Sequence, residues 1–128
     1  MNAIVSKILI VGAGSCFGGM TRYLIGRAIP FSGHGGFPWG TFLVNVVGCF
    51  IIGLVYGLID KGCQLSEGMK LFLTVGFCGG FTTFSSFMNE NYLLFLGSEH
   101  LSVALYTVAS LFVGFLSVYL AYSLVRVS

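Results

Sequence analysis

Residues 79–87 read Gly-Gly-Phe-Thr-Thr-Phe-Ser-Ser-Phe, and they lie in the middle of an apolar stretch that runs from about Met69 to Phe95. Glycine is a poor residue for a helix interior, costing about 1 kcal/mol relative to Ala. The hydroxyls of Thr82 and Thr83 can bond to the local backbone and cap a helix that restarts. We therefore predict a membrane helix that is broken near Gly79–Thr83. A glycine kink made for packing, with its backbone groups satisfied by Thr and Ser, is the alternative.

A break of this kind exposes backbone groups that attract ions. The first half ends in carbonyls without donors, which favour a cation, and the second half begins with N–H groups without acceptors, which favour an anion. Non-helical backbone is tolerated at membrane depth only where it is buried in protein or lines water. The broken segment is therefore the predicted functional region.

The composition requires a membrane environment. Of the 128 residues, 56% are hydrophobic and only 8% are charged, whereas a soluble domain usually carries about 25% charged residues. The net charge of +2 is too small to favour a nucleic-acid partner. About 20 apolar residues cross the hydrocarbon as a helix, and four such segments are predicted: Ile4–Ile29, Gly40–Ile59, Met69–Phe95 and Leu101–Val127. The expected fold class is an all-α integral membrane protein with four transmembrane helices, the third broken, in one domain over residues 1–128.

Small residues recur at a spacing of four within three of these spans. The pairs are Gly14 with Gly18, Gly53 with Gly57, and Gly76 with Gly80. Membrane helices associate through close backbone packing, so each pair predicts a tight helix contact.

The first span lacks a convincing small-residue cleavage site, and we interpret it as a retained helix and not as a signal peptide.

The distribution of Lys and Arg leaves the orientation open. An even number of spans puts both termini and the connection at residues 60–70 on one side of the membrane. That side has four basic residues against two on the other, a weak bias under the positive-inside rule. Two alternatives remain. The chain has a single orientation with both termini inside, or it inserts in both directions and pairs with an inverted copy. The first side holds Lys7, Lys61, Lys70 and Arg126, and the other holds Arg27 and Arg22.

Aromatic residues line the predicted restart of the third helix. Phe81, Phe84 and Phe87 recur every third residue, which predicts that they lie near one helical face. Such a stripe commonly faces lipid or the core. Here Ser85 and Ser86 are interleaved with it, and the edge of an aromatic ring is electropositive. The face therefore also suits the wall of an anion pathway.

Three further polar residues are costly at membrane depth and so are functional candidates. Asn45 offers two uncharged N–H donors, which suit a permeating anion, and an interhelical hydrogen bond is the alternative of equal weight. Arg22 either extends to the interface or supplies a positive field at a vestibule. Glu90 is expected toward a helix end, where it caps or pairs.

The four cysteines form no CxxC pair and are interpreted as small hydrophobic residues.

Three motifs together resemble the CrcB/Fluc family of fluoride channels, and the resemblance covers essentially the whole chain. They are Gly18-Gly19-Met20-Thr21-Arg22-Tyr23, the pair Gly40-Thr41 followed by Asn45 and Gly48, and residues 79–87. Met88 stands where the family often has a small polar residue.

The resemblance implies an antiparallel, dual-topology homodimer in a bacterial plasma (inner) membrane, with two fluoride pathways. A structural Na⁺ on the two-fold axis would be held by the backbone carbonyls of Gly79 and Thr82. The implied function is passive, fluoride-specific export that relieves cytoplasmic toxicity, with no enzyme activity, organic cofactor or nucleic-acid partner. By position, the pathway residues would be Asn45, Phe84, Phe87, Ser85, Thr41, Ser110 and Tyr106, with Arg22 near a vestibule.

Other function classes make different demands on the chain. A small multidrug-type dual-topology transporter also has four spans, but it predicts a carboxylate in the first span, where this chain has only Arg22. A membrane enzyme of the thiol–disulfide kind needs paired reactive cysteines. A structural scaffold predicts no ion flux from pure protein in liposomes.

Overall fold

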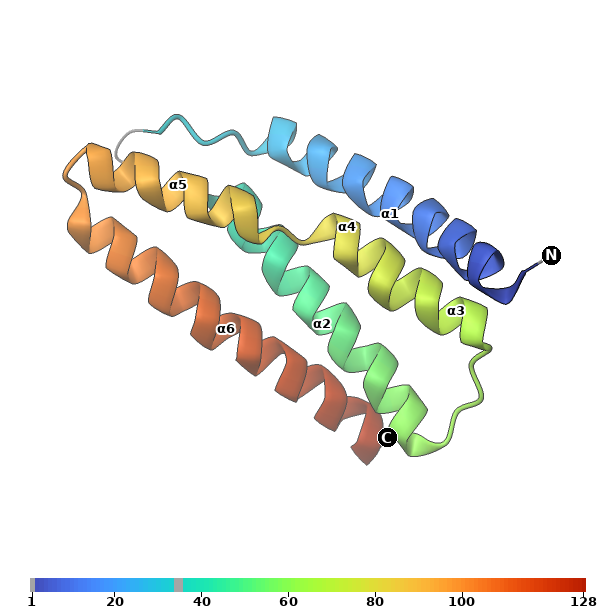
Figure 1. Cartoon of the computed structure of the whole chain (residues 1–128). Coiled ribbons are helices and arrows are strands. Elements are labelled where there is room, and N and C mark those ends of the chain that lie inside the picture. The colour runs from blue at the N-terminus through green and yellow to red at the C-terminus, as the bar shows by residue number, and fades with distance from the viewer. Residues whose placement is uncertain (1, 34–35) are drawn as a thin grey trace.

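The computed structural model describes residues 2–33 and 36–128, and its described elements are all helical (Figure 1). Four helical spans are long and apolar enough to cross a membrane, which confirms the predicted fold class for the single chain. The third span is divided into several elements. In chain order the helices are α1 (Ala3–Ala28), α2 (Trp39–Lys61), α3 (Glu67–Leu71), the π-helix η1 (Phe72–Cys78), α4 (Gly79–Phe81), α5 (Phe84–Leu96) and α6 (His100–Val127).

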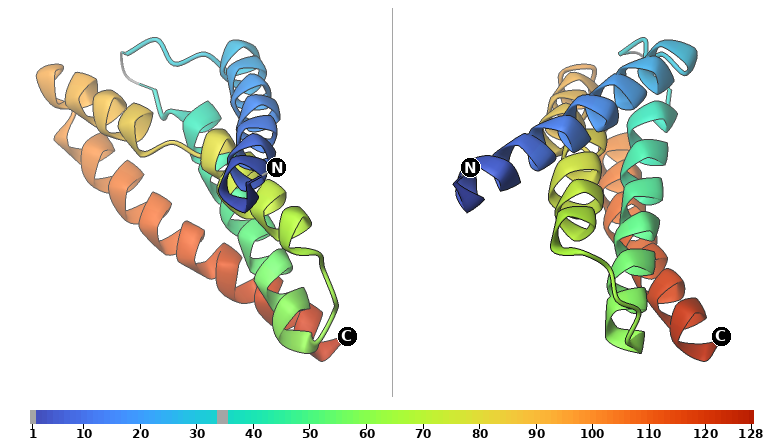
Figure 2. Two further views of the ribbon diagram at one scale, coloured as in Figure 1. Left: turned by 45° about the vertical axis from the view of Figure 1, so that its right-hand side comes forward. Right: turned by 90° about the vertical axis from the view of Figure 1, so that its right-hand side faces the viewer.

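Helix α1 packs on one side of the divided third span, and α2 and α6 pack on the other. Helix α1 lies against η1 and α4, while α6 runs along α2 (Figures 1 and 2). Both termini and the 62–66 connection lie at one end of the bundle, and the 97–99 connection lies at the other (Figure 1). Asp60 and Arg126 approach to 3.6 Å at the first end, where both side chains are largely exposed. An exposed ion pair of this kind adds little stability.

The helices begin and end at residues that satisfy free backbone groups. The side chains of Asn2 and Ser66 accept hydrogen bonds from the N–H groups of Ile4 and Met69, which are standard N-caps. Gly62 ends α2 with φ 104°, a left-handed conformation that favours glycine.

The third span is broken within the predicted range Gly79–Thr83, at Thr82 and Thr83 and not at the glycines before them. Thr82 has ψ 161°, and Thr83 has φ −152° and ψ 121°, so both are extended. Gly79 and Gly80 are helical within α4. A Cβ on Gly80 would lie 2.6 Å from the carbonyl oxygen of Ser15, so this glycine permits close packing on α1. The two β-branched threonines, which favour extended backbone, form the break itself.

A π-helix precedes the break, and no feature of the sequence predicted it. Residues Phe72–Cys78 form η1, within which the Thr74 hydroxyl donates to the Lys70 carbonyl at 2.6 Å. π-Helical turns are rare and occur frequently at functional sites. Here the distortion lies where the third span contacts α1 most closely.

The predicted glycine contacts are confirmed. A Cβ on Gly14 or Gly18 would collide with backbone of η1, and a Cβ on Gly76 would meet backbone of α1. On the other side of the bundle, Gly53 and Gly57 pack against the backbone of α6. Small residues therefore bring both pairs of helices into backbone contact, as membrane packing requires.

The predicted phenylalanine stripe is only partly correct. Phe81 precedes the break, is 3% exposed and stacks on Phe77 with a ring-centroid distance of 5.3 Å. Phe84 and Phe87 follow the break on α5, with exposures of 72% and 6%. The extended Thr82–Thr83 segment interrupts the helical periodicity, so Phe81 does not share their face.

We expect Gly18→Ala to lower the free energy of unfolding by about 1–3 kcal/mol, because the added Cβ collides with the Phe77 carbonyl. Gly19→Ala is the matched control, since a Cβ there meets nothing within 4 Å. Thermal or denaturant unfolding of the purified protein in detergent measures both. Equal stability of the two variants would contradict the packing described for α1.

Candidate functional site

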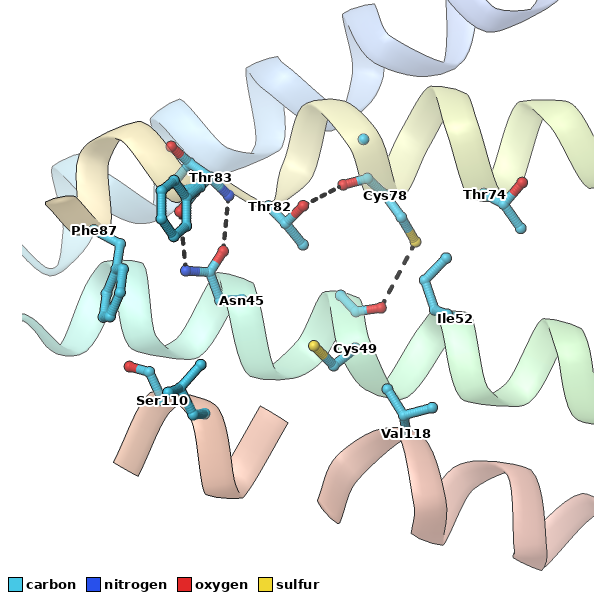
Figure 3. Close-up of a pocket in the computed structure, with 14 residues that line it drawn as sticks. Asn45, Cys49, Ile52, Thr74, Cys78, Thr82, Thr83, Phe87, Ser110 and Val118 are labelled. Carbon is cyan, nitrogen blue, oxygen red and sulfur yellow. Dashed lines mark hydrogen bonds between the residues drawn. The ribbon is translucent and has the colours of Figure 1, made fainter. Parts of the chain in front are cut away.

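A cavity of about 440 Å³ opens beside the break, between α2, the third span and α6 (Figure 3). It brings together six of the predicted site residues, namely Asn45, Gly79, Thr82, Phe84, Phe87 and Ser110. The rest of its lining is mostly small or apolar, and it comprises Gly48, Cys49, Ile52, Thr74, Cys78, Thr83, Leu111 and Val118.

Asn45 binds the broken backbone at both ends of its amide. Its Oδ1 accepts a hydrogen bond from the Thr83 N–H at 2.7 Å, and its Nδ2 donates to the Thr83 carbonyl at 3.1 Å (Figure 3). The side chain therefore substitutes for a neighbouring peptide group. An amide nitrogen carries two hydrogens, so one donor of Asn45 is not used by this pair of bonds.

These bonds leave two carbonyls without their helical donors. In a continuous helix the Thr83 N–H would bond the Gly79 carbonyl, but it bonds Asn45 instead. The Ser86 N–H would likewise bond the Thr82 carbonyl, but it donates to the Thr83 hydroxyl at 3.1 Å and caps α5. Gly79 and Thr82 are the residues expected to hold a cation, and both line the cavity.

Thr82 is fixed from both sides. Its N–H and hydroxyl both donate to the Cys78 carbonyl, at 3.0 and 2.8 Å. Its methyl group occupies the position that a Cβ on Gly48 would take. The Cys78 thiol donates to the Gly48 carbonyl at 3.8 Å (Figure 3). Helix α2 thus holds the break through a glycine and an asparagine one turn apart.

Arg22 caps the helix that ends at the break. Its Nε donates to the Gly80 carbonyl at 3.1 Å, which places a cation at the negative end of the preceding helix. Arg22 also lines a second cavity of about 350 Å³ on the other side of the break. That cavity is also lined by Arg27 and Glu90, and Thr83 lines both cavities.

Glu90 lies within the bundle, where it binds two of the predicted pathway residues. Its carboxylate accepts hydrogen bonds from the Thr41 hydroxyl at 2.6 Å and the Tyr106 hydroxyl at 2.7 Å. Glu90 was expected to cap or pair toward a helix end. It lies in the middle of α5 and does not cap it, but it does pair, with these two hydroxyls. Its acidic side chain inside an apolar segment marked it as a candidate, but the sequence did not indicate these two partners.

The remaining predicted residues divide between the cavity and its surroundings. The rings of Phe84 and Phe87 are 6.0 Å apart, and Phe87 meets Tyr106 edge-on at 4.9 Å. The Ser110 Oγ is buried without a hydrogen-bond partner. Ser85 is exposed beside Thr83, 3.3 Å between hydroxyl oxygens, and does not line the cavity. The arrangement therefore presents neutral donors and ring edges next to the N-terminus of α5.

Sequence comparisons place the chain among known proteins. The family model described as CrcB-like protein, Camphor Resistance (CrcB), matches residues 9–122. The fluoride-specific ion channel FluC of Prosthecochloris aestuarii is 45% identical over 127 residues, covering 99% of this chain and 98% of that protein. FluC of Chlorobaculum tepidum is 46% identical over 108 residues (84% and 85%), and FluC of Thermus thermophilus is 43% identical over 120 residues (94% of each).

We expect Asn45→Leu to speed hydrogen exchange at the Thr83 amide by about tenfold or more, because that N–H loses a buried acceptor. Asn45→Asp keeps the acceptor oxygen and should leave this amide slow to exchange. Hydrogen–deuterium exchange followed by mass spectrometry distinguishes the two variants. Slow exchange at Thr83 in Asn45→Leu would show that Asn45 does not hold the break.

Proposed function

The chain belongs to the CrcB family, and on that premise we propose that it is a fluoride-specific channel through which fluoride leaves a bacterial cytoplasm passively. The observation that carries the proposal is the cavity at the break. There the N-terminus of α5, the spare N–H of Asn45 and the rings of Phe84 and Phe87 meet without a fixed positive charge. No enzyme activity and no organic cofactor are part of the proposal.

The chemistry of fluoride matches these donors. Fluoride is small and strongly hydrated, so a pathway must replace its water with several short-range donors. A helix N-terminus, an amide, hydroxyls and ring edges attract an anion. Because none of them carries a full charge, the ion is solvated without being trapped. Fluoride that enters the cell as HF and then ionises would leave by this route.

We also propose that Na⁺ binds the carbonyls of Gly79 and Thr82. The support is that the donors of both carbonyls are diverted, to Asn45 and to the Thr83 hydroxyl. Both residues line the cavity, and neutral carbonyl oxygens suit a hard monovalent cation. A single chain supplies few ligands, so the same carbonyls from a second copy would complete the site.

An inverted second copy is the proposed partner. Phe84 is 72% exposed although it lines the cavity beside the break, and a partner seated over it would close the pathway. The weak Lys and Arg bias is compatible with insertion in both directions. The protein would then be an antiparallel homodimer of the inner membrane, in contact with lipid.

A small multidrug-type transporter is the alternative function. Such a transporter needs a carboxylate that exchanges protons for a cationic substrate. Glu90 is a carboxylate inside the bundle, but both of its oxygens are engaged by Thr41 and Tyr106. Helix α1, where that class places its carboxylate, has Arg22 instead.

We expect purified protein in liposomes to release fluoride, and Phe84→Ile to slow this efflux about tenfold because the ring edge is lost. Asn45→Asp should slow it as well, since the carboxylate repels the anion. Phe115→Ile is the matched control, because Phe115 is also exposed (77%) but lies on α6 away from the cavity. A fluoride-selective electrode measures the rates. Proton-coupled uptake of an aromatic cation with no fluoride flux would establish the alternative.

The orientation can be tested with Cys63, which is exposed in the connection after α2. In a variant whose other cysteines are replaced by Ser, we expect a membrane-impermeant thiol reagent to label about half of Cys63 on intact cells, since the charge bias is weak. Permeabilised cells give the full signal for comparison. Labelling of all or none of the protein would mean a single orientation and would exclude the inverted dimer.

A further inference from the structure

Asn91 is a buried amide without a partner. It lies on α5, four residues after Phe87, and is 8% exposed. Neither its Nδ2 nor its Oδ1 has a hydrogen-bond partner, and in the described part of the chain the Ser110 Oγ is the one other buried side-chain polar atom in this condition. Asn45, by contrast, uses both ends of its amide on the backbone.

Asn91 shares the buried face of α5 with large apolar residues. Its neighbours on the buried face of α5 are Phe87 and Leu94, which form a core cluster with Tyr106. The rings of Phe31, Phe37 and Phe42 pack against this cluster. An amide that is buried without hydrogen bonds loses its hydration and gains nothing in return. Stability alone would therefore favour leucine, which has a similar size.

The position of Asn91 continues the proposed pathway. Phe87 lines the cavity at the break, and its ring meets Tyr106 edge-on at 4.9 Å. Helix α5 leads from the break toward the end of the bundle that carries the 97–99 connection (Figure 1). One turn beyond Phe87, Asn91 is the buried polar side chain of α5.

We propose that Asn91 is a further binding station for fluoride, between the Phe87 ring and the water at that end of the bundle. This proposal of a further binding site, or station, rests on the proposed channel function. Nδ2 donates to the anion, and Oδ1 accepts from a water molecule that the ion retains. The adjacent carboxylate of Glu90 makes no hydrogen bond to this donor, and its oxygens accept from the hydroxyls of Thr41 and Tyr106 instead.

The first test compares two asparagines on α5 in fluoride-loaded liposomes. We expect Asn91→Leu to slow fluoride efflux by about tenfold or more, while its thermal stability stays the same or rises. Asn89→Leu is the matched control, because Asn89 is exposed on another face of α5, and it should keep the wild-type rate. A more stable Asn91→Leu protein with unchanged efflux would overturn the station.

A binding measurement separates fluoride from water. In wild-type protein with ¹⁵N-labelled asparagine, fluoride should shift the side-chain NH₂ resonance of Asn91 and chloride should not. An NH₂ signal that does not respond to fluoride would mean that the amide holds water only, and would overturn the proposal. If the wild-type protein itself releases no fluoride, the channel function fails. If wild type conducts and the Asn91 results are negative, only the station fails.

Discussion

Inside a bilayer, a peptide group that leaves the helical hydrogen-bond pattern has no water to bond, and Asn45 meets this constraint for Thr83. One side chain from α2 provides the acceptor for the Thr83 N–H and the donor for its carbonyl, at 2.7 and 3.1 Å. Each unmade bond at this depth would cost several kcal/mol. The break can therefore persist without lipid-exposed backbone, and the ends of α4 and α5 can face a cavity.

The neighbouring contacts depend on that arrangement and reinforce it. Gly48 leaves space for the Thr82 methyl group, and Arg22 bonds the Gly80 carbonyl from the opposite side. Helix α2 is itself held in backbone contact with α6 by Gly53 and Gly57. The break is therefore bonded to a closely packed pair of helices on one side and to α1 on the other.

The extent to which the sequence predicts this structure follows from the range of each interaction. The spans and the glycine contacts depend on local hydrophobicity and on residue size, and both were predicted. The break was predicted near Gly79–Thr83 from local propensity, and it lies within that range. That it falls on Thr82 and Thr83 depends on Asn45, which is distant in sequence and bonds the Thr83 backbone. The π-helix and the bonds of Glu90 to Thr41 and Tyr106 also depend on other helices. Phe81 left the predicted stripe because a helical period cannot be extended through a break.

Thr83 lies between the two carbonyls proposed to bind Na⁺ and the helix proposed to face fluoride, and this position links two properties that could otherwise evolve separately. Its hydroxyl withdraws the donor of the Thr82 carbonyl, and its N–H withdraws the donor of the Gly79 carbonyl. The same residue starts the helix that presents Phe84 and Phe87. A substitution that adjusts the proposed Na⁺ site would also move the helix proposed to face fluoride, so a change at either one is expected to require compensating changes at the other. This part of the chain is consequently poorly suited to gradual divergence, whereas the exposed residues of α6, such as Phe112 and Phe115, do not carry this double constraint.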